Sequence, residues 1–153
     1  MTAVISSSLI RSDASAWELN PITEKLVQSL QPSVAARGNH LINDIAEDIC
    51  VDANRELLAT VLAGLIGTVN HQVSGSNIRL TAKQYSDVIL VHLKDYNNTG
   101  NLVVDKKIQA LAEKMGGFVG VSSQRNNLTT IAFCFPNLPM EAGVPEENTL
   151  AAA

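Results

Sequence analysis

The spacing of hydrophobic positions changes several times along the chain, and each change predicts a new element. The clearest pattern begins near Leu57, where apolar residues recur at helical spacing as far as Val69 and form one wide stripe. We expect this stretch to be a buried helix that Asp52 caps at its N-terminus. The stripe consists of Leu57, Leu58, Val61, Leu62, Leu65, Ile66 and Val69.

Two other segments also have helical spacing. The first begins at Asn20-Pro21, where Asn is a favourable N-cap and Pro suits the first helical position, and Gly38 ends it. The second covers residues 105–115, and the paired glycines that follow would stop it. The chain therefore contains three predicted helices.

The segments between and after the helices have strand spacing. We expect strands in three pairs: two short ones within residues 40–51, a hairpin over residues 78–93 that turns at 84–87, and another over residues 118–135 that turns at 125–127. Helices that alternate with strand pairs indicate an α+β two-layer sandwich. We expect a mixed, mostly antiparallel sheet that three helices cover on one face.

Composition limits the number of domains and the class of protein. The chain has 153 residues, of which 46% are hydrophobic and 17% charged, which excludes an intrinsically disordered chain and fits one domain. Residues 1–16 and 137–153 lack periodicity, and we interpret them as tails around a domain at 17–136.

Charge and cysteine content exclude further classes. The net charge is −4 and the 11 Lys and Arg residues are scattered, so no nucleic-acid partner is expected. Cys50 and Cys134 belong to no metal-binding motif, and we interpret them as reduced, buried thiols. We found neither a secretory signal nor a membrane span in the sequence, which favours a cytoplasmic location without membrane contact.

Three phrases support a family resemblance. They are LVQSLQPSVAARGNHLINDIAEDICVDANRELLATVL, VILVHLKDY and IQALAEKMGGFVGVSSQRNNLTTIAFCFP, and they lie between Trp17 and Pro136. Together with the order of elements, they resemble the ATP-binding domain of sensor histidine kinases, which belongs to the GHKL superfamily. The resemblance implies the same sandwich fold and, in intact members, Mg-ATP binding and phosphoryl transfer.

The residues that would bind Mg²⁺ in this family differ here. The resemblance places the polar ridge of the family's second helix at Thr60, Gly64 and Thr68. None is an amide or a carboxylate, whereas Mg²⁺ requires hard oxygen ligands in octahedral geometry. Asn70 lies two positions past Thr68, on another side of the helix, and cannot substitute. We therefore expect no metal site.

The loop expected to bind adenine is altered as well. The resemblance aligns Asp95 with the aspartate that contacts the adenine amino group, but Asn97 and Thr99 replace the glycines that follow it in the family. Asp95 is therefore either a vestigial nucleotide contact or an aspartate on the surface at the end of a strand. Intact members also have a long lid before the last helix, whereas only residues 96–104 are available here.

We identify no catalytic residue at the start of the last helix or among the histidines. Asp105 puts a negative charge where the γ-phosphate would lie, and we expect Lys106 and Lys107 on a solvated helix face. No acidic residue follows His40, His71 or His92, as it does at the family's phosphorylated histidine. We expect no catalytic residue, and neither ATP nor Mg²⁺ as a cofactor.

Small residues replace the polar ridge: Ala59, Thr60, Ala63, Gly64, Gly67 and Thr68. The former pocket has either collapsed onto this face, which we favour, or stayed open for a partner's helix or a small ligand.

Our leading hypothesis is a catalytically inactive histidine-kinase-like domain that acts as an interaction module in two-component-type signalling. It would bind another signalling protein, and a homodimer is possible. One alternative is a nucleotide or small-molecule sensor that uses Asp95. Another is a serine kinase of the anti-sigma-factor type.

Overall fold

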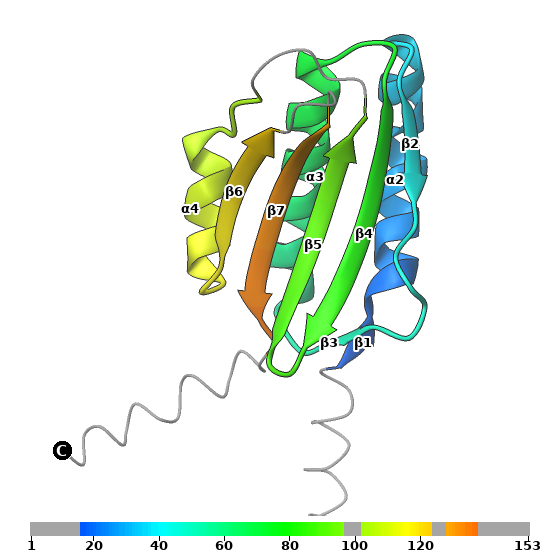
Figure 1. Cartoon of the computed structure of the whole chain (residues 1–153). Helices are drawn as coiled ribbons and strands as arrows, with labels where there is room; N and C mark the ends of the chain where they lie inside the picture. The colour runs from blue at the N-terminus through cyan, green and yellow to red at the C-terminus, as the bar shows by residue number, and fades with distance from the viewer. Residues whose placement is uncertain (1–15, 97–101, 124–127, 138–153) are drawn as a thin grey trace, which may run out of the picture.

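The computed structural model describes residues 16–96, 102–123 and 128–137. Helices α2 (Leu19–Ala36), α3 (Arg55–Gln72) and α4 (Lys106–Lys114) cover one face of a five-stranded sheet (Figure 1). The sheet has the order β2-β4-β5-β7-β6, and only the β2–β4 pairing is parallel. The predicted α+β sandwich, with its mixed and mostly antiparallel sheet, is therefore confirmed.

Strands form at each of the predicted places, although the two short ones within residues 40–51 belong to different sheets and do not pair with each other. The strands are β2 (His40–Asn43), β3 (Cys50–Val51), β4 (Asn77–Tyr85), β5 (Val88–Asp95), β6 (Phe118–Ser123) and β7 (Thr129–Pro136). The β4–β5 hairpin is longer than expected, since the turn contains only Ser86 and Asp87. The predicted turn at 125–127 and both tails, apart from Ala16 and Asn137, lie outside the described residues.

The first helix does not start as predicted. It begins at Leu19, and its N-cap is Glu18, whose side chain makes no capping bond. The Nδ2 group of Asn20 instead donates to the carbonyl oxygen of Ile45 (2.6 Å). A short strand precedes the helix: β1 (Trp17–Glu18) pairs with β3 in a separate two-stranded sheet. A two-residue strand has no periodicity, so its pattern could not reveal it.

The cap of α3 also differs from the prediction. Asn54 is the N-cap, and its Oδ1 accepts a hydrogen bond from the Leu57 backbone N–H (2.9 Å). The Asp52 backbone N–H donates to Oδ1 of Asn137 (2.8 Å), which connects this loop to the end of β7. Both residue types are favourable caps, so spacing alone did not distinguish them.

The core lies between the helices and the sheet. Every second residue of β5 and β7, together with Ile78 and Leu80 of β4, is buried against the helices, and the residues between them face the other side. The largest buried side chains there are Ile78, Leu80, Ile89, Ile131, Phe133 and Phe135. The helices leave the opposite face of the sheet uncovered (Figure 1).

The last helix matches its prediction. Asp105 caps α4, which ends before Gly116, a residue with φ of +76°. Gly117 lies so close to β7 that a Cβ atom there would collide with the carbonyl oxygen of Cys134. The glycine pair therefore allows both the sharp turn and the close approach of β6 to β7.

Candidate functional site

The predicted ridge of Thr60, Gly64 and Thr68 lies along one side of α3. The hydroxyl groups of its two threonines form hydrogen bonds with the backbone of the same helix. The Thr60 hydroxyl donates to the Glu56 carbonyl oxygen (2.9 Å), and the Thr68 hydroxyl donates to that of Gly64 (2.8 Å). Back-bonding of this kind is common for Thr within helices. Gly64, halfway between them, contributes no side chain.

At Gly64 the helix is in direct contact with α4. A Cβ atom at this position would lie 3.0 Å from both Cδ1 and Cγ1 of Ile108. Ile108 is partly buried and packs against the core. At the centre of the ridge the face is therefore closed by a hydrophobic side chain, as the collapsed alternative expects.

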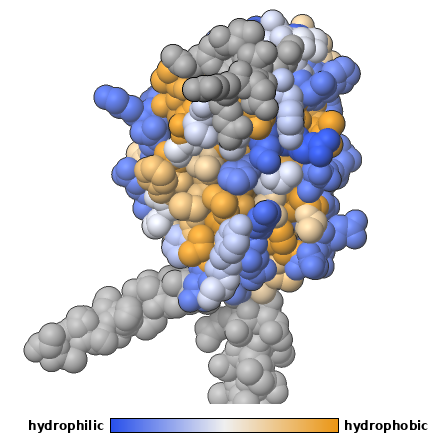
Figure 2. All heavy atoms as spheres, viewed as in Figure 1, coloured by the Kyte–Doolittle hydropathy of each residue, from blue (hydrophilic) through white to orange (hydrophobic). Residues whose placement is uncertain are grey.

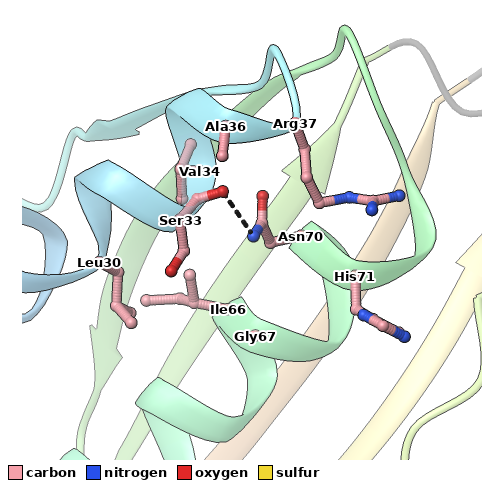
Figure 3. A pocket seen from close by; sticks show the side chains of 9 residues that line it. All are labelled: Leu30, Ser33, Val34, Ala36, Arg37, Ile66, Gly67, Asn70 and His71. Carbon is pink, nitrogen blue, oxygen red and sulfur yellow. Dashed lines mark hydrogen bonds between the residues drawn. The ribbon is translucent and has the colours of Figure 1, made fainter.

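Gly67 lies one turn further along α3 than Gly64, where the helix is open. A Cβ atom there would meet nothing within 4 Å. Gly67 lines a groove of about 400 Å³ between α2 and α3, with Leu30, Val34 and Ile66 as its apolar part (Figure 3). The small residues of α3 thus do not form one uniform surface.

The segment before α4 is attached to the C-terminal end of α3. The Gln72 side chain makes two hydrogen bonds with the backbone of Val103: Nε2 donates to its carbonyl oxygen (2.7 Å), and Oε1 accepts from its N–H (3.0 Å). Leu102 and Val104, on either side, are buried in the core. Sequence reasoning missed Gln72, because an exposed glutamine in a helix gives no signal of such a contact.

The N-terminus of α4 has a carboxylate of its own. Oδ1 of Asp105 accepts a hydrogen bond from the Lys107 backbone N–H (3.2 Å). Lys106 and Lys107 are exposed, as expected for a solvated helix face.

Asp95 is not on the surface, so that interpretation of the strand end is wrong. It is 1% exposed, lies at the end of β5 between Ile78 and Thr129, and accepts a hydrogen bond from the Ser76 hydroxyl. The replacements at Asn97 and Thr99 lie outside the described residues.

Ser76 connects Asp95 to a buried polar network. The Ser76 backbone N–H donates to Oδ1 of Asn39 (2.9 Å), and Nδ2 of Asn39 donates to Oδ1 of Asn70 (2.8 Å). Nδ2 of Asn70 in turn donates to the Ser33 carbonyl oxygen (3.3 Å; Figure 3). The network joins α2, α3 and the strands at one end of the sandwich. Asn70 thus holds helices together, away from the ridge.

The histidines and cysteines are dispersed. His40 and His71 are exposed and His92 is partly buried. Cys50 is exposed and Cys134 is partly buried, so the expectation of two core thiols is wrong. Within residues 16–96, 102–123 and 128–137, no three His, Cys, Asp or Glu side chains are grouped as metal ligands.

Three solved structures are similar over most of the chain. The catalytic domain of histidine kinase ThkA gives a TM-score of 0.67 at 14% identity and covers 81% of this chain and 97% of that one. The fold is that of a histidine kinase catalytic domain. Histidine kinase AdeS from Acinetobacter baumannii gives 0.66 at 11% identity over 88% and 80% of the two chains. A histidine kinase from Burkholderia phymatum gives 0.64 at 14% identity over 89% and 78%.

These likenesses confirm the GHKL-like fold that the three sequence phrases indicated. At such low identity they concern the histidine kinase fold alone. No family model and no curated protein matches the sequence. Among the helices the structure describes, none is long and apolar enough to cross a membrane.

Proposed function

We propose that this chain is a histidine-kinase-like domain without kinase activity, a pseudokinase, that acts as an interaction module in two-component-type signalling. The observation that carries the proposal is the contact between Gly64 and Ile108. It puts a hydrophobic side chain of α4 at the centre of the ridge where the resemblance expects the nucleotide and its metal ion.

The residues present do not fit Mg²⁺. The two hydroxyls of the ridge already donate to backbone carbonyls, and Gly64 offers no ligand. Mg²⁺ demands near-octahedral oxygen coordination, usually from carboxylates and phosphates. Neither an amide nor a carboxylate is available on this side of α3 between Thr60 and Thr68.

The residues near α4 do not favour phosphate either. A helix N-terminus attracts anions through free N–H groups and a positive dipole end. Here the Asp105 carboxylate accepts from one of these N–H groups and adds negative charge to the same place. The Gln72–Val103 hydrogen bonds keep the preceding segment against α3.

A signalling protein is the partner we propose. The histidine kinase ThkA, which gives a TM-score of 0.66 at 14% identity, has been solved in complex with the response regulator protein TrrA. This chain covers 51% of that kinase, and we propose by analogy that a signalling protein also docks on this domain. We place this activity in the cytoplasm, independent of nucleic acid and membrane.

Incubation of the pure protein with Mg²⁺ and ATP labelled at the γ-phosphate tests the proposal. We expect no phosphate release above the buffer blank and no labelled protein, while an active histidine kinase catalytic domain assayed in parallel hydrolyses ATP. Mg²⁺-dependent turnover that Gly64→Leu abolishes would contradict the proposal and support a serine kinase.

A nucleotide or small-molecule sensor is the second candidate. It is favoured by the burial of Asp95 at the strand end that the resemblance assigns to adenine recognition. A sensor would bind nucleotide without Mg²⁺, and the change Asp95→Asn would weaken that binding at least tenfold. Calorimetric titration with ADP distinguishes this candidate from a module that binds no nucleotide.

A further inference from the structure

The face of the sheet opposite the helices exposes hydrophobic side chains over the half near the β4–β5 turn. Phe118 is 66% exposed, Tyr85 52% and Val88 39%. Strand pairing makes the surface continuous: Phe118 lies beside Cys134, which lies beside Leu90, and Tyr85 lies beside Val88. Figure 2 views this face and shows apolar residues gathered over its middle and lower part. Exposed apolar surface of this kind marks interaction sites.

The same face is basic, although the chain has a net charge of −4. Lys83 is next to Leu90, and His92 and Lys94 follow along β5. In the five strands, all within the described residues, Asp95 is the one carboxylate, and it points into the core. Burial, Lys94 and Lys83 together lower the pKa of His92, consistent with positive charge around it.

A shallow hollow of about 440 Å³ continues the face beside β2 and β4. Ile42 and Tyr96, both largely exposed, line it together with Arg79. The Arg79 guanidinium lies 6.0 Å from the centre of the Tyr96 ring and 3.3 Å from the Asp44 carboxylate. Asp44 already pairs with Arg79. Among the described residues, the basic groups of this face without an ion-pair partner are therefore those of Lys83 and Lys94.

We propose that this uncovered sheet face, defined by Phe118, Tyr85, Val88, Leu90, Lys83 and Lys94, docks an amphipathic helix of a partner protein with apolar and acidic side chains. The inference rests on the proposed role as an interaction module and names its surface.

Size and charge select this occupant. An eight-residue strand spans about 26 Å and five strands about 19 Å, so the face matches a helix of about 18 residues, roughly 27 Å long. Apolar residues on that helix would cover Phe118 and Leu90, while carboxylates would pair with Lys83 and Lys94. A second copy of this chain would bring a second face with exposed lysines and no outward carboxylate in its five strands against the first, which is unfavourable.

The test uses the full chain and a fluorescent 18-residue peptide of leucine and glutamate at helical spacing, with fluorescence anisotropy as the readout. The comparison probes are the same peptide with lysine in place of glutamate and a 20-nucleotide single-stranded DNA. We expect the glutamate peptide to bind at least tenfold more tightly than either. Tighter binding of the DNA, or equal binding of the two peptides, would overturn the inference.

Matched charge variants locate the contact. The double change Lys83→Glu and Lys94→Glu should weaken glutamate-peptide binding at least tenfold. Lys25→Glu with Lys114→Glu changes the net charge equally on exposed helical positions and should weaken it less than twofold. Equal weakening by both pairs, or loss of self-association in the face variant alone, would contradict the proposal, the latter in favour of a second copy.

Thiol labelling of the unaltered chain gives a readout that does not depend on how the variants fold. Cys134 is partly buried on the face, whereas Cys50 is exposed in the two-stranded sheet. Saturating glutamate peptide should slow labelling of Cys134 at least fivefold and leave Cys50 unchanged. Unprotected Cys134 would contradict the inference while leaving the proposed lack of kinase activity intact, because nucleotide turnover and nucleotide binding test that proposal separately.

Discussion

The two sides of α3 differ sharply in what they contact. On the sheet side, Leu58, Leu62 and Leu65 are almost completely buried and keep helical spacing. On the α4 side, Gly64 faces Ile108, and the hydroxyls of Thr60 and Thr68 bond to their own helix. One helix therefore packs into the core on one side, while its other side carries Thr60, Gly64 and Thr68, none of which is an amide or a carboxylate.

If the proposed function is right, the requirements of fold and of nucleotide binding have separated within one element. Packing depends on the volume and spacing of apolar side chains, which the sheet side satisfies. Metal binding depends on particular oxygen ligands, usually those of carboxylates and phosphates, and we propose that the side with Thr60, Gly64 and Thr68 does not supply them.

The largest expected effect is a loss of stability, and it tests how the side of α3 that faces the sheet is packed. Leu62→Ala removes a side chain that is 1% exposed and should lower the free energy of unfolding by about 2–5 kcal/mol. Leu57→Ala, at a partly buried position of the same helix, is the control and should have a smaller effect. Urea denaturation measures both. A loss below about 1 kcal/mol for Leu62→Ala would mean that the sheet side does not determine stability.

The second test concerns the α4 side and has a matched control within the helix. Gly64→Leu forces a side chain against Ile108 and should destabilise by about 1–3 kcal/mol. Gly67→Leu has open space and should be neutral or stabilise by up to about 1 kcal/mol, since leucine favours helix. If both variants are equally stable, the α3–α4 contact is open and the collapsed interpretation is wrong.

The third expected effect is smaller and concerns the segment before α4. Gln72→Ala removes both hydrogen bonds to Val103 and should cost about 1 kcal/mol, because the side chain is exposed. Hydrogen exchange at the Val103 amide should also accelerate. Gln109→Ala, an exposed residue of α4, serves as the control. Unchanged exchange in Gln72→Ala would show that the segment is held by other contacts.

The smallest expected effect is a pH dependence of the folding stability, which arises from His92 on the uncovered face of the sheet. Burial, Lys94 and Lys83 lower the pKa of His92, so its proton binds more readily in the unfolded chain. This contribution to stability is complete above the ordinary His pKa of about 6.5 and is lost as the pH falls toward the lowered value. His92→Gln should flatten this slope in urea midpoints between about pH 7 and 5. An unchanged slope would contradict the assignment of this pH dependence to His92.

The sequence was sufficient for the order of the helices and of the strands after the first helix, because long apolar stripes and strand pairs have clear periods, whereas the two-residue β1 was missed. The stripe from Leu57 to Val69 and the glycine pair after α4 are examples. Helix starts were less predictable: Asn20 and Asp52 are good caps by type, yet the helices begin after Glu18 and Asn54. A cap depends on local backbone geometry, and several suitable residues occurred nearby.

The site was only partly predictable. Alignment located Gly64 and Asp95, but their environments are made by residues distant in sequence, Ile108 for the first and Ser76 for the second. No periodicity or motif connects such pairs. The network through Asn39 and Asn70 was missed for the same reason.

A thermal melt of the pure protein with and without millimolar Mg-ATP, ADP and AMP tests the central claim most directly. A ligand at 100 times its dissociation constant would stabilise by about 2.7 kcal/mol, or about 5–10 °C for a domain of this size. We predict no shift with any of the three nucleotides. A shift that requires Mg²⁺ would contradict the account, because it would mean that the α3 ridge still holds a metal–nucleotide complex.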